Sequence, residues 1–293
     1  MPAIMKRREA RTRTEDLMEF IVERHHIYRR KSAGHPKPWT SNNILQQYRF
    51  CNVFRELDTE TIWIAENWRK PHADDPDLWF AMVVSRLVNW HESLDEIGFP
   101  VPWEPDHFVK VMEDRKQRQL KCFTGAYLIP ANASGGSKAV SVAALLTTMW
   151  DNRERLCRIV HGTLAQSHRK LMACQGLGSF LAAQVVADIK YVEPLRSAAD
   201  WWTWAASGPG SKRGLNRDLG RRVKDPWTES EWFRQLQLLH QEIRPLIRSA
   251  MPKLQLHAQD LQNCLCEFDK YERVRLGEGK PRSQYPGAGP SRS

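Results

Sequence analysis

The sequence predicts an all-α protein, because apolar residues recur at helical spacing along most of its 293 residues while alternating strand patterns are scarce. Hydrophobic residues make up 41% of the chain and charged residues 27%, which is a globular rather than a disordered composition. A chain of this length buries a sizeable core without disulfides or metals. We expect one helical domain over residues 1–276. A disordered tail should follow over 277–293, where Gly, Pro and Ser are frequent and no periodicity is found.

The expected helices follow from this periodicity in chain order. In the first, Leu17, Phe20 and Ile21 share one face, and Thr14 is a suitable N-cap. A second is expected within residues 40–51, where hydroxyl residues precede apolar residues at helical spacing. Further helices are expected over 59–69, 76–91, 105–117, 137–150, 152–173, 228–248 and 254–272.

The charge and the cysteines restrict the class of protein. Lys and Arg number 44 against 34 acidic residues, and a net charge of +10 points to a polyanionic partner, with nucleic acid first. No apolar run is long enough for a membrane span, and the N-terminus has no signal-peptide pattern. The six cysteines lack metal-ligand spacing, so we expect reduced thiols in a cytoplasmic protein that has no metal site and needs no cofactor.

A Gly-Leu-Gly turn between two helices is the most informative segment. Gly176, Leu177 and Gly178 separate the end of one helix from a second helix that begins at Ser179, within a hairpin over about 163–191. A glycine turn exposes consecutive N–H groups, and with the helix N-terminus that follows they attract a phosphate. The segment resembles a helix-hairpin-helix DNA clamp, and an ordinary pair of antiparallel helices is the alternative.

Two acidic residues after this turn are catalytic candidates. In DNA glycosylases of the helix-hairpin-helix class a catalytic Asp follows the hairpin, and Asp200 lies 22 residues after Gly178. Asp188 is closer to the turn, and either residue could instead be a structural cap. Position 180 is Phe where bifunctional glycosylases carry a Lys, so a lyase activity is disfavoured.

A basic, glycine-rich stretch over 207–224 follows, and we expect it to be a loop. Its glycines and proline, together with Ser211, Lys212, Arg213 and Arg217, suit a phosphate or pyrophosphate. A solvated basic loop is the alternative. The spacing is not that of a P-loop, and no P-loop motif occurs elsewhere in the sequence.

A third group lies earlier in the chain. Arg49, Asn52 and Arg55 recur at helical spacing beside apolar residues, so we expect them on one helix face. They could line a substrate pocket, and the pattern fits a solvated charged face equally well.

Together these segments resemble one family. The motifs are P-W-T-x3-I-L-x2-Y-R-F-x-N-V-x-R-E-x-D at 38–58, G-A-Y at 125–127, the Gly-Leu-Gly hairpin and G-P-G-S-x-R-G-L at 208–215. They resemble the α-glutamyl/putrescinyl thymine pyrophosphorylases of bacteriophage thymine hypermodification. That family is similar to the helical domain attached to 5-hydroxymethyl-deoxyuridine DNA kinases. The resemblance covers roughly 15–250 and implies a DNA-glycosylase-like helical fold.

The resemblance also implies an activity. The substrate would be double-stranded phage DNA carrying 5-(pyrophosphoryloxymethyl)uracil, and an amino acid or polyamine would displace the pyrophosphate in the host cytoplasm. The cations named above would bind pyrophosphate, and the target base would leave the stack. Because the sequence has no P-loop, a transferase is preferred to a kinase. A base-excision glycosylase and a non-catalytic DNA-binding partner of such a kinase remain alternatives.

Overall fold

The computed structural model describes residues 13–124, 137–156, 162–252, 254–281 and 283–285. Within these ranges the secondary structure is helical and no strand forms, which confirms the all-α prediction. The G-A-Y motif lies outside the described residues. Among the helices described, none is both long and apolar enough to cross a membrane.

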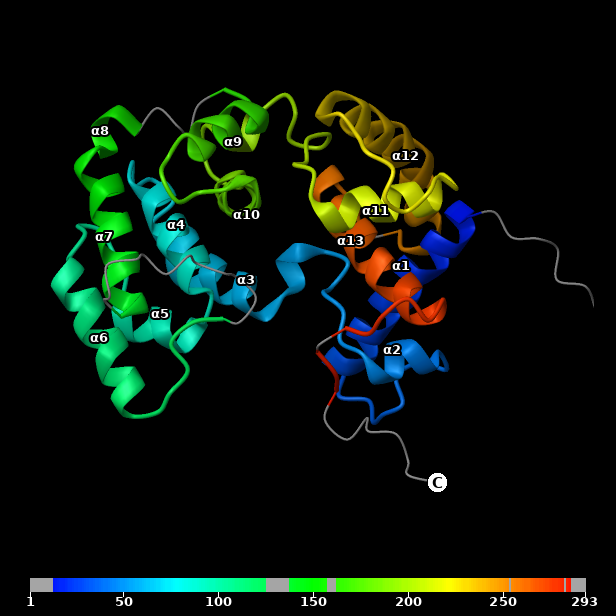
Figure 1. Cartoon of the computed structure of the whole chain (residues 1–293), viewed down its shortest axis with the longest axis horizontal. Coiled ribbons are helices and arrows are strands. Elements are labelled where there is room, and N and C mark those ends of the chain that lie inside the picture. Colours follow the sequence, from blue (N-terminus) through cyan, green and yellow to red (C-terminus); the bar gives the residue numbers. More distant parts are fainter. Residues whose placement is uncertain (1–12, 125–136, 157–161, 253, 282, 286–293) are drawn as a thin grey trace, which may run out of the picture. The chain divides into compact units, whose positions relative to one another are not determined.

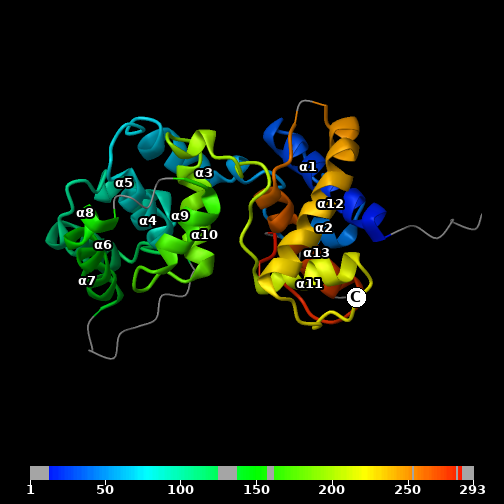
Figure 2. The same cartoon turned by 90° about the horizontal axis from the view of Figure 1, so that it is seen from above.

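The chain divides into two compact units (Figures 1 and 2). Unit 1 combines both ends of the chain, residues 1–55 and 207–293, and unit 2 is the continuous segment 56–206. This is a finer division than the single domain expected from the sequence, which stays a prediction.

The described residues of unit 1 form five α-helices. They are α1 (Arg13–Ser32), α2 (Asn43–Gln47), α11 (Pro209–Asp218), α12 (Glu229–Ala250) and α13 (Ala258–Arg275). Helix α13 packs against the other four, and Leu261, Leu265 and Phe268 on it are buried. In Figure 1 the orange α13 lies beside the blue α1, so the two ends of the chain share one core.

Unit 2 is arranged around α4. Its helices are α3 (Thr59–Ile64, continued by a π-helical turn over Ala65–Arg69), α4 (Leu78–Val88), α5 (His91–Ile97), α6 (Pro105–Gln117), α7 (Lys138–Asp151), α8 (Arg153–Leu156), α9 (Leu164–Met172) and α10 (Ser179–Ile189). Every residue of α4 is buried, as expected of a helix that is apolar on all sides. Helix α10 packs against it.

The stretch 207–224 differs from the loop expected there, because α11 occupies much of it. Pro209 stands at the first helical position, and Ser211 accepts the Gly208 N–H to cap the helix start. The glycines allow α11 to approach α13. A Cβ on Gly210 would lie 2.3 Å from the sulfur of Cys266, and one on Gly214 would lie 2.0 Å from the carbonyl oxygen of Leu265. These two glycines therefore serve helix packing.

Residues 48–54 also differ from expectation, because they form no helix. Helix α2 ends at Gln47, and the chain then runs between α1 and α13. Arg24 donates to the carbonyls of Phe50 and Cys51 at 2.7 and 3.1 Å. Glu267 accepts the Cys51 N–H at 3.0 Å. Side chains distant in sequence thus replace the helical hydrogen bonds.

The end of the described chain returns to this segment. Gln284 forms an isolated antiparallel bridge with Tyr48, and hydrogen bonds join Arg49 to Ser283 and Tyr285 to Gln47. Part of the expected disordered tail is therefore paired with the chain, and residues 286–293 lie outside the described ranges.

Candidate functional site

The Gly-Leu-Gly turn joins α9 to α10 in unit 2. Gly176 has a φ of +83°, which favours glycine, and Leu177 is buried. Gly178 is the N-cap of α10, and no side chain caps this helix. His168 packs behind the turn, with its Nε2 2.9 Å from the carbonyl oxygen of Ser179. The start of α10 is therefore exposed, and its first-turn N–H groups lack intrahelical acceptors.

Asp200 lies at the start of α9. Its two carboxylate oxygens accept the N–H groups of Leu164 and Ala165 at 2.8 and 3.0 Å. A carboxylate at a helix N-terminus satisfies orphan donors and opposes the positive end of the helix dipole. This geometry gives Asp200 a structural role, and a catalytic one stays a prediction.

Asp188 is enclosed in unit 2. It is fully buried, and both oxygens accept hydrogen bonds of 2.6 Å from the Arg86 guanidinium. Arg86 also donates to Thr61 and Asn89. Since buried charges are stable only when paired, this pair is part of the core between α4 and α10.

The basic residues of α11 face carboxylates of unit 1. Lys212 pairs with Glu229 at 2.6 Å, and Arg213 and Arg217 both pair with the buried Asp269, at 2.8 and 3.0 Å. Arg217 also pairs with Glu278, and Ser211 is fully buried. The structure brings these four predicted residues together on one helix, and the three cations already have anionic partners.

The earlier group is spread along the segment that precedes α3. Arg49 is exposed and lies over the Tyr285 ring at 5.4 Å. The Asn52 carbonyl accepts a hydrogen bond from Asn263, and the Arg55 N–H donates to Asp260. The expected common helix face of Arg49, Asn52 and Arg55 is absent, because side chains of α13 hold the backbone of Asn52 and Arg55, and the Arg49 N–H donates to the Ser283 carbonyl.

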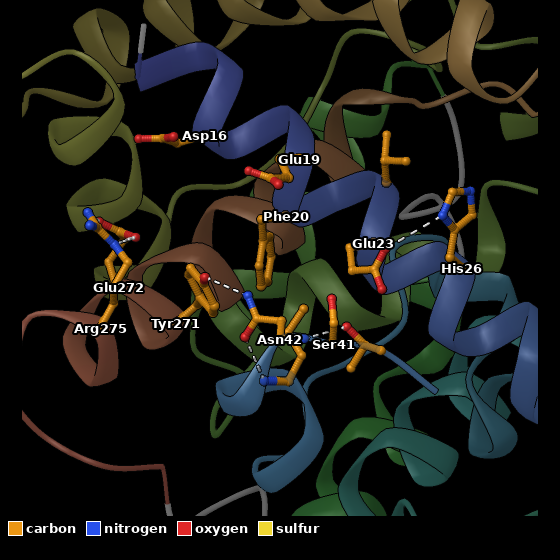
Figure 3. A pocket seen from close by; sticks show the side chains of 13 residues that line it. Asp16, Glu19, Phe20, Glu23, His26, Ser41, Asn42, Tyr271, Glu272 and Arg275 are labelled. Carbon is orange, nitrogen blue, oxygen red and sulfur yellow. Dashed lines mark hydrogen bonds and ion pairs between the residues drawn. The ribbon is translucent and has the colours of Figure 1, made fainter. Parts of the chain in front are cut away.

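Unit 1 contains a pocket of about 540 Å³ that was not predicted from the sequence (Figure 3). We call it the α1–α13 pocket. It is lined by Asp16, Glu19, Phe20, Val22, Glu23, His26, Thr40, Ser41, Asn42, Leu45, Tyr271, Glu272 and Arg275. Figure 3 shows the acidic residues of α1 along one side and Tyr271, Glu272 and Arg275 of α13 on another.

The pocket combines aromatic rings with an excess of negative charge. Phe20 is buried, and its ring lies 5.2 Å from that of Tyr271. The Tyr271 hydroxyl accepts a hydrogen bond of 2.9 Å from Asn42. Arg275 is held by Glu272 at 2.5 Å, so it is already neutralised. Of the other three carboxylates, Glu23 pairs with Arg30 at 3.2 Å, and the lining stays net negative in a chain whose net charge is +10.

This arrangement suits an organic cation. Carboxylates attract an ammonium group, and ring faces stabilise both its charge and its methylenes. The sequence carries a weak signal for it, because Asp16, Glu19 and Glu23 recur at i, i+3 and i+7 of one helix. That spacing by itself indicates only a solvated face. In the described part of the chain no group of His, Cys, Asp and Glu could hold a metal ion.

Comparisons with known proteins give one family. A family model described as "5-hmdU DNA kinase, helical domain" matches residues 11–281. A curated protein, the 5-hmdU DNA kinase of Bacillus phage SP10, is 26% identical over an alignment of 226 residues, which covers 68% of this chain and 36% of that kinase. The chain thus spans about a third of the length of this relative. No solved structure matches it significantly.

Proposed function

The chain belongs to the family of helical domains of 5-hmdU DNA kinases, and on this premise we propose that it is a transferase of phage thymine modification. Its substrate would be double-stranded DNA carrying 5-(pyrophosphoryloxymethyl)uracil. An amine, from an amino acid or a polyamine, would replace the pyrophosphate.

The α1–α13 pocket is the observation that carries this proposal. A glycosylase or a passive DNA-binding module has no need of a hollow for a small cation. A transferase must hold an amine that is protonated at neutral pH. A net negative lining beside two aromatic rings, in a pocket of about 540 Å³, meets that need.

The proposed reaction forms a C–N bond at the 5-methylene carbon and breaks its C–O bond, whose electrons leave with pyrophosphate. The incoming ammonium must first lose a proton, and a pocket carboxylate such as Glu19 is a suitable acceptor. Lys212, Arg213, Arg217, Ser211, Arg49, Asn52 and Arg55 remain candidates for the pyrophosphate. The cations of α11 would have to exchange Glu229 and Asp269 for the leaving group.

The Gly176–Ser179 turn is the proposed contact to the DNA backbone. The uncapped start of α10 supports it, because exposed N–H groups at a helix N-terminus bind phosphate. This turn would make the chain resemble a helix-hairpin-helix protein in function as well as in sequence pattern. The target base would be extruded from the duplex, as it is in DNA glycosylases.

A second candidate function is a non-catalytic DNA-binding partner of a kinase. The pairing of Arg213 and Arg217 with Asp269 favours it, since cations that are already neutralised bind pyrophosphate less well. The glycosylase alternative is less favoured, because both carboxylate oxygens of Asp200 are engaged at the start of α9.

Mass spectrometry of nucleosides tests the proposal. The protein is incubated with DNA containing 5-(pyrophosphoryloxymethyl)uracil and a mixture of amino acids and polyamines, and the DNA is then digested. A new amine adduct supports the transferase, free base indicates a glycosylase, and unchanged DNA indicates the binding partner.

A paired variant tests the pocket. The Glu19→Gln protein should form the adduct at least about tenfold more slowly at low amine concentration, because the pocket loses one attractive charge. The matched control is Asp225→Asn, at a partly exposed carboxylate outside the pocket. Equal rates in both variants would remove the pocket from the mechanism.

A further inference from the structure

Unit 1 carries a second surface, which lies at the C-terminal end of α1 and next to the α1–α13 pocket. We call it the Trp39 face and define it by Arg29, Arg30, Lys37, Trp39, Arg49 and Tyr285. The cations among them are exposed and the two aromatic side chains are half-buried. Segments distant in sequence bring them together: the end of α1, the loop before α2, and the end of the described chain.

Aromatic and cationic side chains alternate across this face. The Trp39 and Tyr285 rings lie edge to face at 5.7 Å. The Lys37 ammonium lies 5.3 Å from the Trp39 ring and 5.2 Å from the Tyr285 ring. The Arg49 guanidinium also lies over the Tyr285 ring, at 5.4 Å. The cations therefore stand beside flat apolar surfaces.

The geometry of the face is fixed by hydrogen bonds. The Trp39 indole N–H donates to the His35 carbonyl at 2.7 Å, and the Trp39 carbonyl accepts from Arg30. The antiparallel pairing of Tyr48 with Gln284 holds Tyr285 in place. A preorganised face loses less entropy when it binds a ligand than a set of mobile side chains would.

A cationic hollow adjoins the face. Its volume is about 310 Å³, and Arg29, Arg30, Ala33, His26 and His35 line it. Glu23 pairs with both Arg30 and His26, at 3.2 and 3.7 Å, which leaves Arg29 as an exposed cation of the hollow. Such a hollow suits a phosphate oxygen, while the adjoining rings suit a base or sugar.

We propose that the Trp39 face binds a DNA strand, with the cations on phosphates and Trp39 or Tyr285 against a base or sugar. Interleaved basic and aromatic side chains are the pattern by which proteins follow a nucleic acid strand. The inference deepens the proposed function, since His26 lines both the hollow and the α1–α13 pocket. DNA on the face would thus lie beside the proposed amine site.

Binding of unmodified DNA to the full chain tests the face without any transfer reaction. The fluorescence anisotropy of labelled duplex and single strands is measured between low and moderate salt. The Lys37→Glu/Arg49→Glu protein should bind at least roughly tenfold more weakly, and the slope of log affinity against log salt should fall by about 2, because two phosphate contacts are lost. Thermal melts of this protein and of the Lys37→Gln/Arg49→Gln protein show whether the fold is retained.

Lys110→Glu/Lys116→Glu is the matched control, at two exposed positions of α6 in unit 2. It should change affinity little. If it weakens binding as much as the Lys37→Glu/Arg49→Glu variant, the attraction is diffuse and the proposal is wrong.

Chemical modification locates the contact directly. DNA should protect Lys37 from acetylation and leave Lys110 reactive, as read by peptide mass spectrometry. Equal reactivity of Lys37 with and without DNA would overturn the assignment. If DNA protects Lys37 but the parent protein transfers no amine to the modified DNA, only the proposed function is contradicted.

Discussion

Asp188 shows at the residue scale what one buried charge does in this protein. Replacing it with Asn leaves the Arg86 guanidinium buried and without its anion. We expect Asp188→Asn to lower the free energy of unfolding by about 3–5 kcal/mol, as measured by urea denaturation. Asp200→Asn keeps one of its two acceptors at the start of α9 and should cost only about 1 kcal/mol. Similar losses in the two variants would contradict these assignments.

His25 links the stability of unit 1 to pH. Burial and, secondarily, the charge of Arg29 lower its pKa from 6.5 to about 4. In the unfolded chain this histidine binds a proton at higher pH than in the folded protein. The contribution of His25 to the free energy of unfolding is therefore fully present above pH 6.5 and is lost as the pH falls towards 4.

The measurement is the free energy of unfolding between pH 4 and 7. The His25→Phe protein keeps a ring against Tyr28 and Phe54, and its stability should depend less steeply on pH. The exposed His35→Gln is the control and should keep the slope of the parent protein. An unchanged slope in His25→Phe would show that other groups determine the acid sensitivity.

The contact of α11 with α13 depends, at the element scale, on glycine. An added methyl group at Gly214 would lie 2.0 Å from the Leu265 carbonyl oxygen, which is backbone and cannot turn aside. We expect Gly214→Ala to separate the helices and to destabilise the protein by at least about 2–3 kcal/mol, seen as a lower melting temperature. In Gly208→Ala the nearest atom to the added methyl group is a side-chain nitrogen at 3.7 Å. The stability of this variant should therefore lie within about 1 kcal/mol of that of the parent protein.

The hairpin between α9 and α10 permits a cleaner variant. Nothing lies within 4 Å of a Cβ built on Gly178, so Gly178→Val should fold normally. Its side chain would nevertheless stand where a phosphate must approach the first N–H groups of α10. DNA affinity at moderate salt should therefore fall while the melting temperature changes little. Gly176→Ala is unsuitable, because it adds a Cβ at a φ of +83° against Leu145.

Prediction from sequence succeeded for helices that carry their own signals. The helix expected over 105–117 has those bounds in the structure, and that expected over 228–248 begins one residue later, at Glu229, after the capping residue Thr228. In both, apolar periodicity acts within the segment itself, and a local start signal helps: Pro105 at the first position of α6 and the Thr228 cap of α12.

Prediction from sequence failed where the contacts that determine the structure join residues distant in sequence. Residues 48–54 are held by Arg24 and Glu267, and α11 forms in a glycine-rich stretch because α13 offers it a surface. The α1–α13 pocket was missed for the same reason. Glu19 looks solvated until Tyr271, more than 250 positions later, is placed opposite it.

At the scale of the whole molecule, unit 2 interrupts unit 1. Residues 56–206 form a compact unit with α4 as their buried centre. We expect this fragment alone to be helical by circular dichroism and to melt cooperatively. The fragment 207–293 alone should show neither property, because α11, α12 and α13 pack against α1 in the whole chain. Cooperative melting of the C-terminal fragment by itself would contradict the division.

The origin of unit 1 in both chain ends has a consequence during translation. Helix α1 leaves the ribosome before α13, which emerges more than 200 residues later. At synthesis rates of about 5–20 residues per second, the interval is on the order of 10–50 s. Throughout it Leu17, Phe20, Ile21 and Ile27, which are buried in the finished protein, have no partner from the C-terminal helices. Until α11, α12 and α13 are made, we expect these apolar side chains to be an exposed surface of the kind that chaperones bind.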